Sequence, residues 1–183
     1  MKSLISFLGA LLLIIVGVGQ TSAQARPKFE IGTQAGLSIM SAGGETITTI
    51  AAPGGGFGGS PTIYAVLYGS SNVAFEPRLG FNRVSSDGSS FSTLDAAGRI
   101  KVFFDDPSES SGYTYGEGAV IRVGGSSSSD SNFGAGAGVG FRHVAASRVA
   151  VSIEGGYRRW FIEDEGLNEF TVSIGVGAIV GAS

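Results

Sequence analysis

The sequence predicts an all-β fold, an eight-stranded antiparallel up-and-down transmembrane β-barrel. Three observations predict it: alternation of apolar and polar side chains, a shortage of charge, and an export signal at the N-terminus. The alternation is clearest over residues 72–82, where the odd positions are apolar and the even positions include Glu76 and Arg78. Successive side chains of a strand point to opposite faces, so this segment has one wholly apolar face and one polar face.

The first 25 residues have the pattern of a secretory signal peptide. Lys2 precedes an apolar run over residues 4–19, and Ala23-Gln24-Ala25 forms a small-x-small cleavage pattern. The apolar run is shorter than the roughly 20 residues that a membrane-spanning helix needs. We therefore expect residues 1–25 to be removed and residues 26–183 to form the barrel domain.

The composition favours a wall that does not face water. Charged residues make up 15% of the chain, against about 25% in ordinary soluble domains. Without Lys2 the chain keeps 15 acidic and 11 basic side chains, and this mild acidity argues against a nucleic-acid partner. There is no cysteine and a single histidine, so neither a disulfide nor a metal site is expected, and no cofactor is implied.

Eight segments of the mature chain alternate, and we expect each to form a strand. They are residues 28–40, 57–69, 72–82, 91–104, 113–123, 133–141, 149–158 and 170–178. In the fifth segment Glu117 falls on the face that otherwise looks apolar, and a bulge at residues 116–118 would restore the phase. In the sixth, a ladder of glycines over residues 134–140 either makes room for long arginines opposite or relieves crowding at a curved wall. A local bulge is also expected at Pro77, which lies in mid-strand and cannot donate to the ladder.

The connections alternate in length. Residues 69–71 and 145–147 form tight turns, whereas the other connections are longer: residues 40–56, 84–90, 124–131 and 162–167, with a further one at 105–111. Transmembrane barrels have short periplasmic turns and longer outer loops, so we expect both chain termini on the periplasmic side. The connection at 105–111 is then an unusually long periplasmic one.

The apolar faces are expected to contact lipid. A secreted lipocalin-like ligand-binding barrel would alternate similarly, with its apolar face inside. The polar faces here carry only one or two charges per strand, too few for a water-facing surface, and four apolar faces run unbroken for about the 9–11 residues that a tilted strand needs to cross a bilayer. Aromatic side chains near strand ends are expected in the two interfacial girdles: Phe29, Phe57, Tyr68, Phe91, Phe104, Phe133, Phe141, Trp160, Phe161 and Phe170.

On these residues the chain resembles the small eight-stranded outer-membrane β-barrel family, the OmpA-like and OmpX-like transmembrane domains. Its local signatures are Asn72-Val73-Ala74-Phe75-Glu76-Pro77-Arg78-Leu79-Gly80 and Tyr157-Arg158-Arg159-Trp160-Phe161. The last strand is similar to the assembly signal of that family but lacks its terminal aromatic residue. The resemblance implies a monomer in the outer membrane of a Gram-negative bacterium. Its implied partners are membrane lipid, lipopolysaccharide and, during insertion, the barrel-assembly machinery.

The polar faces supply a candidate site inside the barrel. An eight-stranded barrel has an interior that side chains just fill. The expected inward charges nearly balance, as a buried set must, because an unpaired buried charge costs several kcal/mol. They are Glu76, Arg78, Asp95, Arg99, Lys101, Glu154 and Arg158. We expect them to form an ion-pair plug, and a gated or binding lumen or a narrow porin is the alternative.

Catalytic chemistry finds little support in the sequence. His143 is expected at the periplasmic rim, on the outward face beside Arg142 and Arg148. Ser147 lies four residues away, but no neighbouring acid would hold the imidazole, so a catalytic triad is not visible. We therefore expect no enzymatic activity and a structural or surface-interaction role. A lipid-modifying enzyme of the outer membrane is the alternative.

Overall fold

The computed structural model describes residues 29–42, 44–51, 62–69, 72–86, 89–124, 129–162 and 166–180. The predicted signal peptide, residues 1–25, lies outside them. Over the described residues, no helix is long and apolar enough to cross a membrane.

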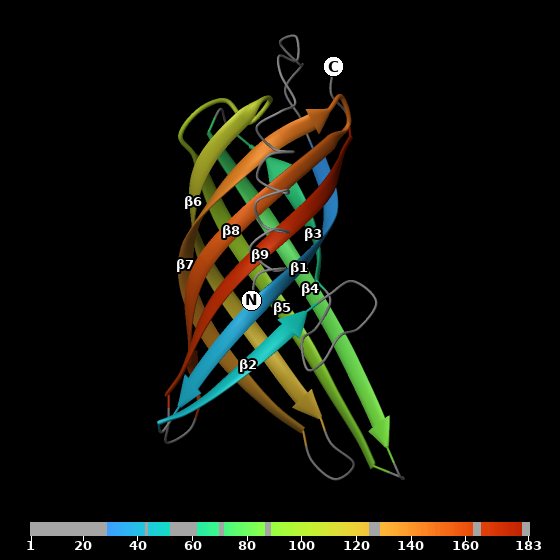
Figure 1. Cartoon of the computed structure of the whole chain (residues 1–183), viewed down its shortest axis with the longest axis vertical. Coiled ribbons are helices and arrows are strands. Elements are labelled where there is room, and N and C mark those ends of the chain that lie inside the picture. Colours follow the sequence, from blue (N-terminus) through green and yellow to red (C-terminus); the bar gives the residue numbers. More distant parts are fainter. Residues whose placement is uncertain are drawn as a thin grey trace, which may run out of the picture.

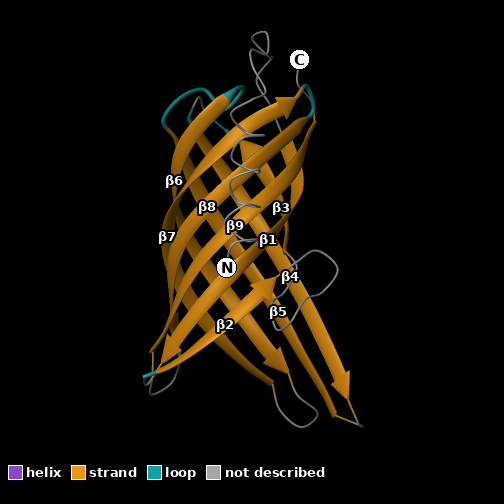
Figure 2. Cartoon of the chain, viewed as in Figure 1, coloured by secondary structure: helices purple, strands orange, loops and turns teal. Residues whose placement is uncertain are grey.

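The described residues form nine antiparallel strands that close into a barrel (Figures 1 and 2). The strands are β1 (Phe29–Ala42), β2 (Glu45–Ala51), β3 (Thr62–Tyr68), β4 (Val73–Ser86), β5 (Ser89–Phe103), β6 (Ser110–Gly124), β7 (Ser129–Ala146), β8 (Val149–Phe161) and β9 (Gly166–Val180). Each of β3 to β8 pairs with the next strand in sequence, and β1 pairs with β9 from Phe29↔Val180 to Ser41↔Asn168. Closure leaves no free edge between the first and last strands, as a bilayer requires.

The wall has eight strand positions because β2 and β3 share one. β9 occupies one edge of β1, and the other edge is divided: its first part pairs with β3 and its last part, Gly36–Ala42, with β2. The predicted eight-stranded antiparallel barrel is therefore confirmed. The prediction of a polar, glycine-rich loop over residues 40–56 is wrong for residues 45–51, because β2 returns along β1 through a turn at Gly44, whose φ of 88° suits glycine.

Neither predicted bulge exists. β4 keeps one register with β3 on both sides of Pro77 and pairs without interruption with β5, so the missing N–H of the proline only interrupts its ladder with β3. β6 also keeps one register across residues 116–118 with both neighbours. The irregularity in the described barrel lies instead between Val144 and Ala146 of β7. The predicted loop at 84–90 is shorter than expected, since β4 and β5 extend to the pair Ser86↔Ser89.

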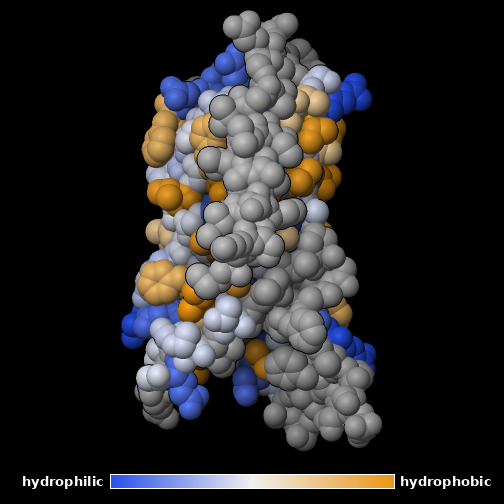
Figure 3. Space-filling view, viewed as in Figure 1, coloured by the Kyte–Doolittle hydropathy of each residue, from blue (hydrophilic) through white to orange (hydrophobic). Residues whose placement is uncertain are grey.

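The outward face of the wall is apolar and the inward face is polar. Leu79 and Val172, for example, are 46% and 55% exposed, whereas Glu76 on the inward face of β4 is 1% exposed. Figure 3 shows apolar side chains around the middle of the wall and hydrophilic ones toward its two ends. This arrangement is the reverse of the lipocalin-like alternative, whose apolar face would lie inside.

The predicted girdle is wrong for two of its aromatic residues. Trp160 is 2% exposed and points inward with Arg158 and Glu154, and Tyr68 points inward to Glu30. The prediction holds for large outward rings such as Phe104, at 64% exposure, and Phe170, at 56%. Phe57 and the side chain of Phe91 lie outside the described part of the chain.

Candidate functional site

The bore of the barrel holds a network of buried charges, which we call the bore network. Its acids are Glu30, Glu76, Asp95, Glu117, Glu154 and Glu169, and its bases are Arg78, Arg99, Lys101, Arg142 and Arg158. The side chains come from β1 and from β4 to β9, so the ion pairs connect opposite sides of the wall. They are held in place by strands, whose alternation directs them inward.

Glu154 of β8 is the centre of the network. One carboxylate oxygen, Oε1, accepts from Lys101 Nζ at 2.9 Å and from the Tyr113 hydroxyl at 2.6 Å. The other, Oε2, accepts from Arg99 Nη1 at 2.7 Å and from Gln34 Nε2 at 2.9 Å. A carboxylate with both oxygens bonded in this way fixes the position of two cations and two neutral groups across the bore.

Glu76 of β4 is the second buried acid at this level. Its carboxylate lies 2.6 Å from Lys101 Nζ, 3.7 Å from Arg99 Nη1 and 3.4 Å from Arg78 Nε. Three cations therefore share two carboxylates, and Arg78 has the longest contacts, since its Nη2 is 4.0 Å from Glu154 Oε2.

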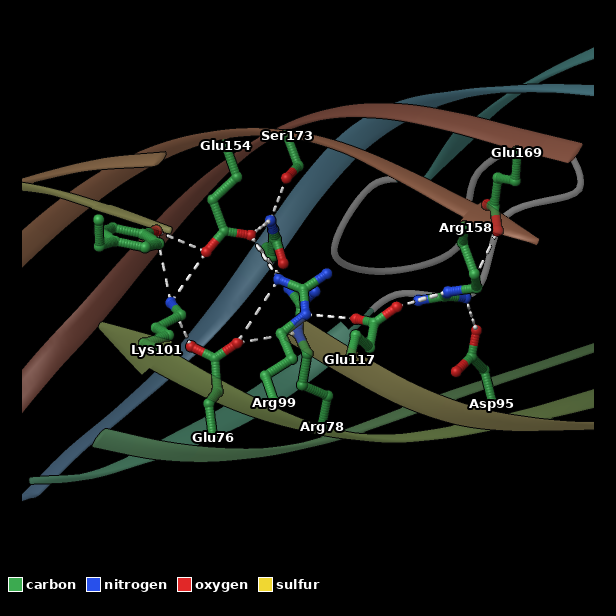
Figure 4. A network of polar contacts seen from close by, with 12 residues as sticks. Glu76, Arg78, Asp95, Arg99, Lys101, Glu117, Glu154, Arg158, Glu169 and Ser173 are labelled. Carbon is green, nitrogen blue, oxygen red and sulfur yellow. Dashed lines mark hydrogen bonds and ion pairs between the residues drawn. The ribbon is translucent and has the colours of Figure 1, made fainter. Parts of the chain in front are cut away.

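The end of the barrel away from the chain termini is the predicted outer end, and toward it the network continues through Glu117 of β6. Glu117 binds Arg99 with one oxygen and Arg158 Nε, at 2.5 Å, with the other. Arg158 Nη1 in turn lies 3.4 Å from both Asp95 and Glu169. Figure 4 shows this chain of contacts, with Lys101 and Glu154 toward one end and Asp95 and Glu169 toward the other.

Toward the chain termini a second ion pair lies deeper in the bore. Arg142 Nη2 is 2.9 Å from Glu30 Oε2, and Glu30 also accepts from the hydroxyls of Tyr64 and Tyr68 at 3.2 and 3.0 Å. Arg142 donates as well to the carbonyl of Pro107 in the connection between β5 and β6. Pro107 is almost completely buried, so this connection packs against the end of the bore.

Two tyrosines of β6 fill the space between the ion pairs and the wall. The ring of Tyr113 lies against Gly140 of β7 and the ring of Tyr115 against Gly138, where a Cβ atom would overlap each ring. Lys101 Nζ is 4.4 Å from the Tyr113 ring centre, a cation–π geometry. The ladder glycines Gly134, Gly138 and Gly140 therefore make room for aromatic rings, and the expectation that they accommodate arginines is wrong. Gly136 instead meets the backbone of Tyr157 and the Cβ atom of Arg158.

The outer half of the bore contains a cavity of about 150 Å³. Its charged lining is Arg78, Asp95, Arg99, Arg158 and Glu169, and its hydroxyl lining includes Ser38, Thr171 and Ser173. Asp95 is the most exposed member of the ion pairs, with 29% of its side chain accessible, so solvent reaches this part of the bore.

All seven residues expected from the sequence point into the bore and take part in ion pairs. Sequence reasoning did not include four further members: Glu30, Glu117, Arg142 and Glu169. For three of them the alternation already indicates an inward direction, since each lies on the polar face of its strand. Glu30 shares that face with Gln34, Arg142 with the glycine ladder, and Glu169 with Ser173. The inward direction of Glu117 was not recognised, because Tyr113 and Tyr115 on the same face of the strand made that face look apolar.

His143 lies at the end of β7 near the chain termini, and its hydroxyl partner is Ser110 instead of Ser147. Ser110 Oγ is 2.5 Å from His143 Nδ1, and His143 Nε2 has no hydrogen-bond partner among the described residues. A serine hydrolase needs a carboxylate that orients the imidazole, and no contact of this kind joins His143 to an acid in the described part of the chain. The same residues contain no group of three side chains suited to a metal ion.

The family model described as outer membrane protein beta-barrel domain matches residues 8–179. The chain belongs to this family. Its membership places the protein in the bacterial outer membrane, and it agrees with the apolar wall and with the predicted resemblance to small OmpA-like barrels. No curated protein sequence matches significantly.

Solved structures share the fold at low sequence identity. Neisserial surface protein A is 16% identical, with a TM-score of 0.64, and the match covers 83% of this chain and 97% of that chain. OprG from Pseudomonas aeruginosa is 9% identical, with a TM-score of 0.55 and coverage of 86% and 98%. Ail of Yersinia pestis, solved with the heparin analogue sucrose octasulfate, is 10% identical, with a TM-score of 0.54 and coverage of 83% and 99%.

Proposed function

We propose that this protein is a closed outer-membrane barrel with a structural or surface-interaction role, and that it is neither a pore nor an enzyme. The observation that carries the proposal is the bore network. Ion pairs from Glu76, Lys101, Arg99 and Glu154 cross the barrel at one level, where each side chain is 5% exposed or less.

Opening such a bore would separate several buried charges at once. Glu154 alone has four partners, and removal of one partner of a buried ion pair costs about 3–5 kcal/mol because the other charge stays unpaired. Thermal fluctuations therefore do not open a continuous water path at this level. Beneath it, Arg142 and the buried Pro107 add a second obstruction near the periplasmic end.

The geometry around His143 supports a role without catalysis, since Ser110 is its hydroxyl partner and the described residues bring no acid to it. A role at the cell surface has a precedent on this fold in Ail, whose name is that of an attachment invasion locus protein. Our proposal takes from that protein only the kind of role, and no ligand.

The proposal includes the surroundings of the barrel. The exposed apolar wall contacts outer-membrane lipid and lipopolysaccharide, and the barrel-assembly machinery inserts it after export by the signal peptide. A monomer is sufficient, because β1 pairs with β9 within one chain and leaves no free edge between the first and last strands.

Conductance in planar bilayers tests the proposal. We expect the full-length mature protein to give no steady current, because the charged side chains fill the bore. Arg158→Ala should loosen the network and admit transient leak currents, since Arg158 contacts Glu117, Asp95 and Glu169. The matched control is Arg159→Ala, because Arg159 is the next residue of β8 and is exposed outside the bore. Large, stable channels from the unmutated protein would replace this proposal by a porin function.

Lipid-A analysis tests the catalytic alternative separately. We expect identical lipid-A acylation in cells with and without the gene. A change that His143→Ala abolishes while the barrel still inserts would assign a lipid-modifying activity.

A further inference from the structure

The geometry points to a binding site for a small monocarboxylate in the outer cavity of the bore, with the guanidinium of Arg78 as its anchor. This inference goes beyond the closed-barrel role, since a blind cavity can bind a ligand without conducting it. It rests on the charge distribution around Arg78 and on the size and lining of the cavity.

Arg78 is the least satisfied cation of the network. Its side chain is only 9% exposed, yet no hydrogen bond joins it to another described residue. Its buried Nε lies 3.4 Å from Glu76 Oε1 but makes no hydrogen bond. Its nearest carboxylates are already bonded to other cations at shorter distances. Glu76 lies 2.6 Å from Lys101 Nζ, and Glu154 lies 2.7 Å from Arg99 Nη1.

A guanidinium carries five N–H donors in a planar fork, and a buried donor without a partner costs free energy. A carboxylate is the group that this fork binds best, through two parallel charge-assisted hydrogen bonds. Arg99 and Arg158 line the same cavity, but both already donate to Glu117. Arg78 is thus the lining arginine whose donors remain for a ligand, among those that the structure describes.

The cavity sets the size and charge of the ligand. A volume of about 150 Å³ is comparable to that of cavities that hold a benzene-sized molecule, so it suits a short carboxylate of a few carbon atoms. Asp95 and Glu169 also line it, and their carboxylates repel additional negative charge. A monoanion is therefore preferred over sulfate or a phosphate dianion.

The lining also distinguishes the two ends of such a ligand. The hydroxyl of Ser173 lies beside Gln34 near the level of Arg78, whereas the apolar side chain of Met40 lines the cavity farther toward the outer end of β1. A carboxylate placed on Arg78 would direct its short alkyl part toward the outer end, where Asp95 is partly exposed to solvent.

Titration of butyrate into the full mature protein in lipid nanodiscs tests this site. Binding is followed by the ¹⁵N–¹H resonance of Arg78 Nε and by isothermal titration calorimetry. We expect a saturable shift of the Arg78 resonance in the millimolar range, and nuclear Overhauser effects from the butyrate methyl group to side chains of the cavity. Butylamine, of similar size and opposite charge, should not bind, and sulfate should bind more weakly than butyrate.

Arg78→Gln should weaken butyrate binding by about tenfold or more, as expected for the loss of a charge-assisted bidentate contact. Arg78→Lys should recover only part of the affinity, because the charge remains and the fork is lost. The matched control is Arg122→Gln, which removes an exposed arginine of β6 whose hydrogen bond to Ser129 lies outside the cavity. Heat-modifiable gel migration verifies that each variant is folded.

The inference is overturned if butyrate does not shift the Arg78 resonance of the wild type, if butylamine binds equally well, or if folded Arg78→Gln retains full affinity. The wild-type shift and the Overhauser contacts decide the question even where a variant does not fold. Failure of this site leaves the closed-barrel proposal intact, since only a stable conductance contradicts that proposal.

Discussion

In the periplasmic half of the bore Tyr113, Glu76 and Ser111 are almost completely buried, whereas in the outer half Asp95 keeps 29% of its side chain exposed beside a cavity of about 150 Å³. Both halves are built on the same alternating strands. The difference lies in the inward residues. The rings of Tyr113 and Tyr115 fill one half against glycines, whereas the other half combines Trp160, which lies against Gly134, with short hydroxyl side chains that leave a cavity. An eight-stranded barrel is thus filled or left hollow according to side-chain volume, with no change of architecture.

The largest effect should come from the centre of the bore. Glu154→Gln removes the charge that Lys101 and Arg99 share, and we expect it to lower the free energy of unfolding by about 3–5 kcal/mol. Glu169→Gln in the outer half should cost less, because Arg158 keeps Glu117 and Asp95 as partners. Urea unfolding of the barrel in lipid vesicles measures both. Equal losses of unfolding free energy would show that the charges of the two halves stabilise the barrel equally.

The next effect compares the wall with the bore. Leu79→Arg or Val172→Arg should cost about 2–4 kcal/mol near the bilayer midplane, because each side chain faces lipid. Ser173→Ala, on the inward face next to Val172, should cost little, since it removes one hydrogen bond with Gln34. The same unfolding assay ranks them, and a reversed ranking would mean that the apolar face lies inside.

A glycine substitution tests how tightly the periplasmic half is packed. In Gly138→Ala the new Cβ would overlap the ring of Tyr115 and the carbonyl of Gly155, so we expect a loss of about 1–3 kcal/mol from overpacking. Gly118→Ala is the control, because a Cβ there meets no atom within 4 Å. If both substitutions were tolerated alike, the aromatic filling would be looser than described.

The smallest effect is expected at the outer end of the network. Asp95→Asn removes a partly exposed charge whose described ion pair, with Arg158, is 3.4 Å long, and should change the unfolding free energy by less than about 1 kcal/mol. A loss as large as that of Glu154→Gln would show that the outer charges are as tightly coupled as the central ones.

The alternation predicted the barrel and its outward face because lipid requires an unbroken apolar surface on every strand. The alternation did not predict the inward face correctly where tyrosine or tryptophan, which are partly apolar, stood at inward positions. Tyr113 and Tyr115 hid the phase of Glu117, and Tyr68 and Trp160 were assigned to the girdle although they lie inward. For Trp160 the correct signal was present, since it continues the inward positions of Glu154 and Arg158.

The division of one wall position between β2 and β3 was harder to predict. Residues 45–51 are rich in the β-branched residues that strands favour, but Ile47 and Ile50 fall on opposite faces, so no alternation marks them, and the glycines on either side favoured a loop. The partners inside the bore could not be predicted either. Local alternation shows only that a side chain points inward. The contact between Glu117 and Arg158 also depends on how β7, which lies between them, is aligned with β6 and β8. The position and size of the cavity depend on the same side-chain packing, so they could not be predicted either.

Cysteine labelling measures the contrast between the two halves most directly, since the chain contains no cysteine. Ser173→Cys lines the outer cavity, and Ser111→Cys lies in the periplasmic half with 2% exposure. With a membrane-impermeant methanethiosulfonate reagent on the folded barrel, we expect rapid labelling of Ser173→Cys and protection of Ser111→Cys, and labelling of both after unfolding. Similar rates at the two positions in the folded protein would contradict a bore that is hollow at its outer end and closed at the other.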